Sequence, residues 1–383
     1  NKLNLDIKAK PQDLAFIQFT GGTTGDPKAV MLTHANIMAN LDQCYCWIQD
    51  ILSDNQQVLV TPLPLYHIFA LVANLLLFFK VGGLNVLIPN PKDLDSFIKT
   101  IKGLKFNVIS GVNTLYLHLL RHPKFKDCDF SELRVAIAGG MGLDKHVAHH
   151  WHQVTNNYLT QGYGLTETSP VLTICPLNEQ FNGSVGKAVK NTQIAIFDEQ
   201  DNKLSVSNSK SSSKYKYKLK GEICVKGPQV MLGYLDNSKA TKSVFNKDGY
   251  LKTGDYGYID DQDYIYVLDR LKDIIIVSGF NVCASEVEQV ILQMPQVSEV
   301  AIIGEDDLEH GEKVVAHVVL ADGVLDNIEK NKNKREGAYN KIEQQIIKYA
   351  HAKLAAYKSP TKVVFHDSLP KSNLGKILKK DLL

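Results

Sequence analysis

Residues 14–28 read LAFIQFTGGTTGDPK, an apolar run that passes directly into a loop rich in glycine and threonine. The glycines let the backbone fold closely around a ligand, the threonines offer hydroxyl donors, and Lys28 adds a positive charge. A loop of this kind after a predicted strand is suited to a polyphosphate. The plain alternative is a polar turn without a ligand.

The loop differs from the Walker A motif of P-loop NTPases at two positions. Counted from Gly22, Pro27 stands where that motif requires glycine, and Ala29 replaces the serine or threonine that would hold Mg²⁺. The sequence therefore disfavours a P-loop NTPase.

Around this loop, from about residue 14 to residue 163, short apolar runs alternate with amphipathic segments. The apolar runs predict strands at 14–19, 58–60, 84–88, 106–109 and 134–138. The helical pattern predicts helices at 71–79, 94–102, 114–120 and 144–153, the last with Asp144 as N-cap. Such alternation is typical of a parallel sheet covered on both faces, whose ligands bind beyond the carboxyl ends of the strands.

Beyond about residue 183 the pattern changes twice. Short strands are predicted at 193–197, 221–225, 249–252 and 264–268, and after residue 270 a helix at 284–294, strands near 300–303 and 314–320, and a long helix ending near residue 356. We therefore expect an α/β fold with two domains. A large domain at 1–270 has a parallel or mixed sheet flanked by helices and a β-rich part at about 183–269, and a small mobile α+β domain occupies 271–383.

The composition of the 383 residues is that of an ordinary globular protein, with 44% hydrophobic residues and a net charge of +2. This charge offers no general reason to expect nucleic acid as a partner. The apolar stretch at 68–79 is shorter than the roughly 20 residues of a bilayer span, so we expect a buried helix. No signal peptide and no paired cysteine motif is evident, which favours the cytoplasm.

The segment 202–220 contains six lysines and six serines. We favour a solvated insertion, and the alternative is a contact with an anionic partner or with the inner face of a membrane.

Further motifs follow the loop in a fixed order. They are AGGM at 138–141, QGYGLTET at 161–168, KTGD at 252–255, DRLKDIIIVSGFNV at 269–282 and PKSNLGK at 370–376. Together with the loop, this set resembles the adenylate-forming (AMP-binding) superfamily over nearly the whole chain. The forms TGGTTG, AGGM and SGFNV look most like bacterial long-chain fatty-acid CoA ligases.

The resemblance implies a two-step reaction with a fatty acid, ATP, Mg²⁺ and CoA. A carboxylate attacks the α-phosphate of ATP to give acyl-adenylate and pyrophosphate, and the thiol of CoA then attacks the acyl carbon to give the thioester and AMP. Because the first step brings an anion to a polyanion, we expect catalysis mainly by positioning and charge neutralisation. Assembly as a homodimer stays open.

The resemblance also implies roles for residues around the nucleotide. Thr166 would touch the α-phosphate, and Thr20 and Glu167 would hold Mg²⁺, a cation that prefers oxygen ligands. The β- and γ-phosphates would be held by Thr20, Gly21, Gly22, Thr23, Thr24, Gly25 and Lys28. The adenine would lie against Gly139, Gly140, Gln161, Gly162, Tyr163 and Gly164. Asp255 would accept both ribose hydroxyls, with Arg270 nearby.

Other roles concern the two chemical steps. Lys376 would bridge the substrate carboxylate and the α-phosphate, since a lysine stays protonated at neutral pH. The plain interpretation of this residue is a solvated basic tail. Lys272 matches the hinge about which the small domain rotates before the second step, bringing residues 278–282, with Gly279 and Phe280, to the nucleotide and CoA.

His67 matches a histidine near the acyl carbon that would orient the substrate. The helix at 68–79 would either line an alkyl tunnel or belong to the ordinary core, and the sequence does not choose between these two interpretations.

Members of this superfamily ordinarily carry a long segment before the glycine and threonine loop. We therefore expect the large domain to be incomplete at its N-terminus and to expose apolar sheet edges. Two alternatives remain beside the CoA ligase. One is an adenylating enzyme that delivers the acyl group to a carrier protein, and the other is a truncated chain without catalytic activity.

Overall fold

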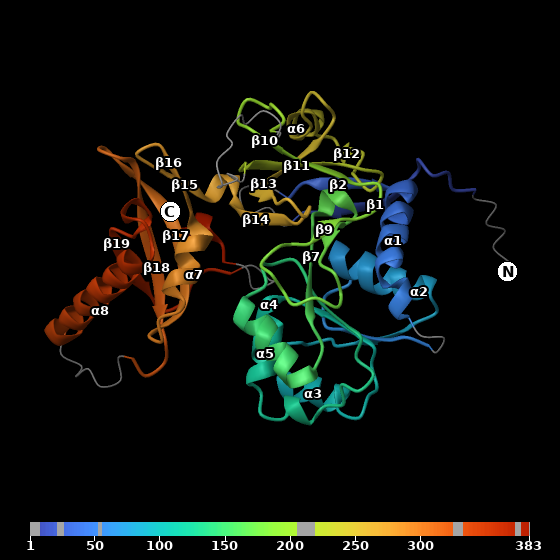
Figure 1. Ribbon diagram of the computed structural model, residues 1–383, viewed down its shortest axis with the longest axis horizontal. Helices are drawn as coiled ribbons and strands as arrows, with labels where there is room; N and C mark the ends of the chain where they lie inside the picture. The colour runs from blue at the N-terminus through green and yellow to red at the C-terminus, as the bar shows by residue number, and fades with distance from the viewer. Residues whose placement is uncertain are drawn as a thin grey trace. The chain divides into compact units, whose positions relative to one another are not determined.

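The computed structural model describes residues 8–20, 27–52, 56–204, 219–324, 332–371 and 377–382 (Figure 1). They form two compact units. The first contains most of the chain up to Val267, and the second contains Gly254–Tyr256 and the residues from Leu268 onward. The domain boundary predicted at residue 270 falls close to this division.

A seven-stranded sheet with the order β4-β3-β5-β6-β7-β8-β9 forms the centre of the first unit. Its strands are β3 (Val58–Thr61), β4 (Leu84–Leu87), β5 (Val108–Gly111), β6 (Val135–Ala138), β7 (Leu159–Gly164), β8 (Val171–Ile174) and β9 (Lys187–Ala188). The strands from β4 to β7 pair in parallel, and β8 and β9 are antiparallel. The predicted parallel or mixed sheet is therefore confirmed.

Helices cover both faces of this sheet. They are α1 (His34–Ile48), a π-helical segment (Ala70–Leu76) that continues as α2 (Leu77–Lys80), α3 (Leu94–Ile101), α4 (Asn113–Arg121) and α5 (Lys145–Thr155). Alternate strand residues point to opposite faces, so Leu59 packs in the cluster with α1 and α2, and Val60 packs in the cluster with α3, α4 and α5. Figure 1 shows α3, α4 and α5 grouped together.

The predicted helices are confirmed, and Asp144 caps α5 by accepting hydrogen bonds from the backbone N–H groups of His146 and Val147. Residues 70–80 are helical, and Ile68, Val72 and Phe78 are buried as expected, but Phe79 is 80% exposed, so the stretch expected to be a buried helix is buried on one side only. Within the described ranges, no helix has both the length and the apolarity needed to cross a membrane.

One expectation about the first strand was wrong. β1 (Leu14–Phe19) is not part of the parallel sheet but pairs antiparallel with β2 (Ala29–Thr33) in a separate three-stranded sheet of order β1-β2-β12, where β12 is Gly233–Tyr234. The physical reason is the short separation of the two runs in the sequence. Phe19 pairs with Ala29, and the nine residues 20–28 between them are too few for the crossover of a dozen or more residues that parallel strands need.

The β-rich part contains a four-stranded sheet of order β10-β11-β13-β14. Its strands are β10 (Gln193–Phe197), β11 (Gly221–Lys226), β13 (Leu251–Ile259) and β14 (Ile265–Arg270), and α6 (Ser238–Val244) precedes β13. β10, β11 and β14 confirm three of the predicted strands, whereas β13 begins at Leu251 and extends to Ile259, well beyond the strand predicted at 249–252. Most of the lysine- and serine-rich segment, residues 205–218, lies outside the described residues.

The second unit contains a five-stranded sheet with two helices. Its elements are β15 (Ile274–Val277), β16 (Phe280–Cys283), α7 (Ala284–Ile291), β17 (Val297–Asp307), β18 (Gly311–Leu320), α8 (Lys332–Lys353) and β19 (Lys362–His366). Ser278 and Gly279 join β15 to β16 in a two-residue hairpin turn, and both have a positive φ, as a type I′ turn requires. The sequence predicted α7, α8, β17 and β18 but not the shorter β15, β16 and β19.

Two edge strands of the first unit carry exposed apolar side chains. β4 ends the seven-stranded sheet, and Leu84 and Leu87 on it are about half exposed. β1 ends the three-stranded sheet, where Ile17 and Phe19 are exposed. Apolar sheet edges were expected to be exposed, and these side chains show that feature.

The helix α1 was not predicted, because part of its buried face is polar. Asn40 is completely buried, and its side chain donates a hydrogen bond to the carbonyl oxygen of Val171 over 2.8 Å and accepts one from the N–H of Val171 over 3.0 Å. Gln43, on the same face, donates to the carbonyl oxygen of Lys190. Apolar periodicity alone therefore does not identify α1 as an amphipathic helix.

Replacing Asn40 with alanine is expected to lower the free energy of unfolding by about 3 kcal/mol. The substitution leaves two buried backbone groups of Val171 without partners, and each such group costs about 1–3 kcal/mol. Urea denaturation followed by tryptophan fluorescence measures the loss. Met38→Ala, on an exposed position of the same helix, is the control and should change stability by about 0.5 kcal/mol at most. Equal losses in the two variants would contradict the role of Asn40.

Candidate active site

The ends of the glycine and threonine loop are closed by hydrogen bonds between Thr20 and Lys28. The N–H of Thr20 donates to the carbonyl oxygen of Lys28 over 2.9 Å, and the N–H of Lys28 donates to Oγ1 of Thr20 over 3.3 Å. These two residues are thereby held side by side at the end of the β1–β2 hairpin. Gly21, Gly22, Thr23, Thr24 and Gly25 lie outside the described residues, so their roles stay predictions.

Thr166 and Glu167 lie on a short 3₁₀ turn, Thr166–Thr168, that directly follows β7. Thr168 is completely buried, and its hydroxyl donates to the carbonyl oxygen of Pro170 over 2.6 Å. A Cβ atom on Gly164 would overlap that same carbonyl, so only glycine fits at the entrance to the turn. The backbone on both sides of Glu167 is therefore held in place by buried contacts.

Tyr234 connects Lys28 with Glu167. Its hydroxyl donates to Oε1 of Glu167 over 2.8 Å, and Nζ of Lys28 lies 4.9 Å from the centroid of its ring. Burial and the neighbouring Glu167 carboxylate raise the pKa of Tyr234, so its hydroxyl keeps its proton. This tyrosine was not predicted from the sequence, since a Gly-Tyr pair carries no signal of its own.

His67 lies in the segment between β3 and the π-helical segment. Burial lowers the pKa of its imidazole, so the ring is mainly neutral at pH 7. The side chain of Gln18 in β1 donates to the carbonyl oxygen of the adjacent Tyr66 over 2.9 Å. Phe69 reaches the loop after β6, because a Cβ on Gly139 would lie only 2.8 Å from its ring. The structure thus connects the His67 segment with β1 and with Gly139.

The residues predicted to surround adenine come from two neighbouring strands. Gly139 and Gly140 follow β6, and β7 contains Gln161, Gly162, Tyr163 and Gly164. Ala138 pairs with Gln161, which brings these two groups to the same edge of the sheet. Gly140 has a φ of 73°, a conformation that favours glycine.

Asp255 and Arg270, the predicted ribose pair, contact each other in the second unit. Nε of Arg270 lies 2.9 Å from Oδ1 of Asp255, and the Asp255 side chain is almost completely buried. Burial raises the pKa of the neighbouring Asp269, whose carboxylate accepts a hydrogen bond from the N–H of Ser285 over 2.9 Å. The segment at Arg270 is thereby attached to the start of α7.

Lys272 and the hairpin residues Gly279 and Phe280 also lie in the second unit. Burial lowers the pKa of Lys272, which sits in the 3₁₀ turn Leu271–Asp273. Phe280 is exposed, and its ring contacts that of Tyr357 at a centroid distance of 4.9 Å.

Lys376 lies outside the described residues, so its catalytic role stays a prediction. Two lysines that flank it are described. Lys371 pairs with Glu299, and Lys379 pairs with Glu288 over 2.8 Å. The charges of these two neighbours are therefore partly neutralised by carboxylates of their own.

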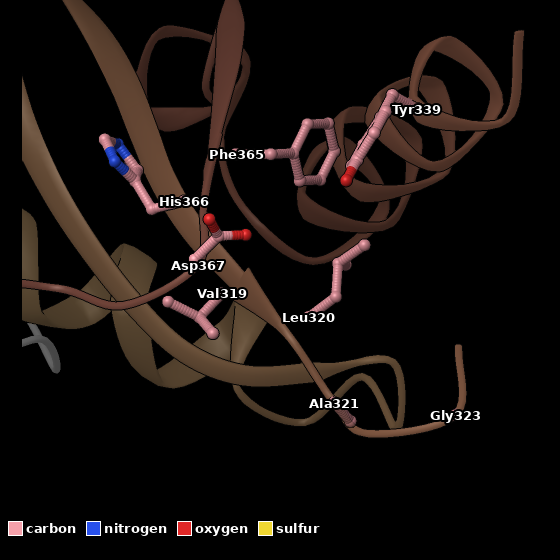
Figure 2. Close-up of a pocket in the computed structure, with 8 residues that line it drawn as sticks. All are labelled: Val319, Leu320, Ala321, Gly323, Tyr339, Phe365, His366 and Asp367. Atoms are coloured by element: carbon pink, nitrogen blue, oxygen red, sulfur yellow. The ribbon is translucent and has the colours of Figure 1, made fainter. Parts of the chain in front are cut away.

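A hollow in the second unit has no predicted site residue among its described lining residues (Figure 2). Figure 2 shows Phe365, His366 and Asp367, at and after the end of β19, with Tyr339 of α8 and Leu320 of β18 around it. Phe365 and Tyr339 contact each other at 4.9 Å between ring centroids, so aromatic carbon forms one of its walls.

Two family models match the chain. One is described as AMP-binding enzyme and covers residues 3–235, and the other is described as AMP-binding enzyme C-terminal domain and covers residues 286–376. The second begins close to the start of α7. Together they include most of the motifs that carried the resemblance noted in the sequence.

Curated relatives match almost the whole chain. A protein of Escherichia coli O157:H7 named long-chain-fatty-acid--CoA ligase is 41% identical over 97% of this chain and 62% of its own length. The protein of the same name from Bacillus subtilis (strain 168) is 36% identical over 97% of this chain and 61% of its own length. The chain thus spans about three fifths of the curated relatives it matches.

Solved structures show the same fold. The crystal structure of ATP-bound MatB from Rhodopseudomonas palustris superposes with a TM-score of 0.83 at 31% identity, over 98% of this chain and 69% of that one. A structure of o-succinylbenzoate CoA synthetase from Bacillus subtilis with the acyl-adenylate intermediate gives a TM-score of 0.78 at 28% identity, over 98% of this chain and 70% of that one.

Proposed function

The chain belongs to the AMP-binding enzyme family, and from this premise we propose that it activates a long-chain fatty acid with ATP and transfers the acyl group to CoA. The products would be acyl-CoA, AMP and pyrophosphate. The names of the curated relatives support the fatty-acid substrate. The observation that carries the proposal is the contact chain from Lys28 through Tyr234 to Glu167, which places a cation and a carboxylate together at the predicted polyphosphate loop.

Nucleotide binding follows from the charges of these residues. The loop from Thr20 to Lys28 would hold the β- and γ-phosphates, with the Lys28 ammonium neutralising part of their charge, and Thr166 would donate to the α-phosphate. Asp255 would accept hydrogen bonds from the ribose hydroxyls, and its ion pair with Arg270 would hold it in place. Neutral His67 would orient the fatty-acid carboxylate without forming an ion pair with it.

Mg²⁺ would screen the charge of the phosphates when it is bound with ATP. Thr20 and Glu167 offer the oxygen donors that this cation prefers. Within the described ranges, no group of three or more His, Cys, Asp or Glu side chains could hold a metal ion. The pair Thr20 and Glu167, with a single carboxylate, fits Mg²⁺, because proteins usually bind this ion through one or two carboxylates together with substrate phosphates.

The two chemical steps need different residues. In the first, the ammonium of Lys376 would bridge the carboxylate and the α-phosphate while negative charge builds between them. In the second, rotation about Lys272 would remove Lys376 and bring Gly279 and Phe280 to the face at which the CoA thiol attacks. Contact with a membrane surface would depend on residues 202–220, most of which lie outside the described residues.

Pyrophosphate release with ATP, Mg²⁺ and palmitate tests the proposal. The chain covers about 62% of the length of its first relatives. The assay therefore compares it with an extended version, to which the residues that precede the matched region in the Escherichia coli O157:H7 relative are added upstream. We expect pyrophosphate from the extended version, and thioester with free CoA rather than with a carrier protein. Thioester on the carrier protein alone would favour the carrier alternative. Release no higher than that of a Lys376→Ala variant of the same version would contradict a catalytic role.

A further inference from the structure

Tyr234 is placed between two opposite charges that would otherwise attract each other. The ring face receives the Lys28 ammonium at 4.9 Å, and the hydroxyl donates to Glu167 over 2.8 Å. Among the ion pairs of the described residues, none involves Lys28 or Glu167. A ring face attracts a cation and a phenol hydroxyl attracts an anion, so one side chain holds both charges without letting them neutralise each other.

The backbone of Tyr234 is held firmly in this position. β12 pairs with β2, where Tyr234 lies opposite Val30, and the N–H of Tyr234 donates to the hydroxyl of Thr241 in α6 over 2.9 Å. The N–H of the following Leu235 donates to the carbonyl oxygen of Ala29, the residue after Lys28. Tyr234 as a whole is 6% exposed.

The Glu167 end of the Lys28–Tyr234–Glu167 contacts is also fixed by a backbone hydrogen bond. The N–H of Met231, three residues before Tyr234, donates to the backbone carbonyl oxygen of Glu167 over 2.8 Å. The short segment 231–235 therefore bonds to the β2 strand on one side and to the Thr166–Thr168 turn on the other. Movement of this segment would change the distance between Lys28 and Glu167.

We propose that Tyr234 is a positioning residue for the nucleotide site, which orients the Glu167 carboxylate toward Mg²⁺ and keeps it from pairing with Lys28. The inference rests on the proposed function, since it assumes that Glu167 holds Mg²⁺ with ATP. With Oε1 accepting the phenol hydrogen bond, Oε2 would remain available as a ligand for the ion. Partners that orient a metal-ligating group in this way typically change metal affinity by about 10- to 100-fold when they are removed.

The chain contains a matched arrangement away from this site. The hydroxyl of Tyr264 donates to Glu179 over 2.7 Å, and Nζ of Lys187 lies 4.6 Å from its ring centroid. Tyr264 is 7% exposed, nearly the same as Tyr234, and none of these three residues belongs to the predicted site. Tyr264→Phe therefore removes the same hydroxyl from the same kind of Lys–Tyr–Glu contact without touching the nucleotide residues.

Calorimetric titration with ATP, in Mg²⁺ and separately in EDTA, tests the inference on the extended version described above. For Tyr234→Phe we expect the dissociation constant of ATP in Mg²⁺ to rise about tenfold or more, and that in EDTA to stay within about twofold, because the ring that holds Lys28 is kept. Tyr264→Phe should leave both constants unchanged. Thermal unfolding of each variant shows whether it is folded at the temperature of the titration.

Tyr234→His provides a second variant that keeps an aromatic ring, but the N–H of its shorter ring does not reach the position of the phenol hydroxyl that donates to Glu167. Like Tyr234→Phe, it should therefore lose Mg²⁺-dependent affinity. If the phenylalanine variant fails to fold, Tyr234→His is compared with Tyr264→His, and a loss confined to the former in Mg²⁺ supports the inference.

The possible results separate the two proposals. If the extended version without any substitution binds ATP no better in Mg²⁺ than in EDTA, the proposed function is contradicted, and the proposed role of Tyr234 is contradicted with it. If the unmodified protein binds as expected but Tyr234→Phe matches it, only the inference about Tyr234 is overturned. Equal weakening of Tyr234→Phe in Mg²⁺ and in EDTA also overturns it, since that is the result of a purely structural role.

Discussion

Replacing Lys376 with alanine is expected to slow acyl-adenylate formation by about 100- to 1000-fold. Loss of a single donor that stabilises developing negative charge has an effect of this size in other enzymes. In the proposed first step, two anionic groups must approach, and the ammonium is the charge that would lie between them. The second step is expected to proceed almost normally, because the lysine would have left the site before CoA enters.

The two half-reactions can be measured separately. Pyrophosphate release from ATP and palmitate reports the first, and conversion of pre-made palmitoyl-adenylate with CoA reports the second. Lys371→Ala is the matched control, because this lysine lies in the same motif but pairs with Glu299. An exposed pair of this kind contributes little, so the control should stay within about twofold. A comparable loss in both half-reactions, or in the control, would count against the assignment of Lys376.

Replacing Asp255 with asparagine is expected to raise the KM for ATP about 10- to 100-fold. A hydrogen bond to a charged acceptor contributes about 1.5–3 kcal/mol, and each 1.4 kcal/mol corresponds to a tenfold change in affinity. The substitution keeps the size of the side chain but removes its charge and replaces one acceptor oxygen with a donor. Because the Asp255 side chain is almost completely buried beside Arg270, water cannot replace the lost interaction easily.

The ribose hydroxyls provide the specific readout. The unmodified protein should bind ATP more tightly than 2′-deoxy-ATP, and this preference should shrink in Asp255→Asn. Asp201→Asn serves as the control, because Asp201 makes an ion pair with Lys252 of the same strand β13 and has no predicted part in nucleotide binding. An unchanged preference for the ribose form in Asp255→Asn would show that another group recognises the 2′-hydroxyl.

Most of the elements were predictable because their signals are local. The strands at the centre of the first unit are short apolar runs, and α5 begins at the predicted N-cap Asp144. The missed elements are those whose local pattern is weak or misleading. The helix α1 presents buried Asn40 and Gln43, and burial along β16 and β19 does not alternate between successive residues as a strand signal requires.

The candidate site was predictable only in part. Order and composition of the motifs pointed to Lys28, Glu167 and Asp255, and each of these has a contact that suits its expected role. Tyr234 was not predictable, because its role depends on a partner 67 residues earlier in the chain. The residues next to Tyr234 in the sequence do not distinguish it from the other tyrosines of the chain.

The amino-acid sequence alone determined the family, the α/β class and the residue types available for binding a nucleotide, because glycine spacing, apolar periodicity and charged side chains are local properties of the chain. Only the tertiary structure decided that β1 leaves the parallel sheet, that a polar helix face is buried against Val171, and that one phenol ring separates Lys28 from Glu167. Those outcomes depend on contacts between distant segments, and their free energies arise only when packing removes the groups from water.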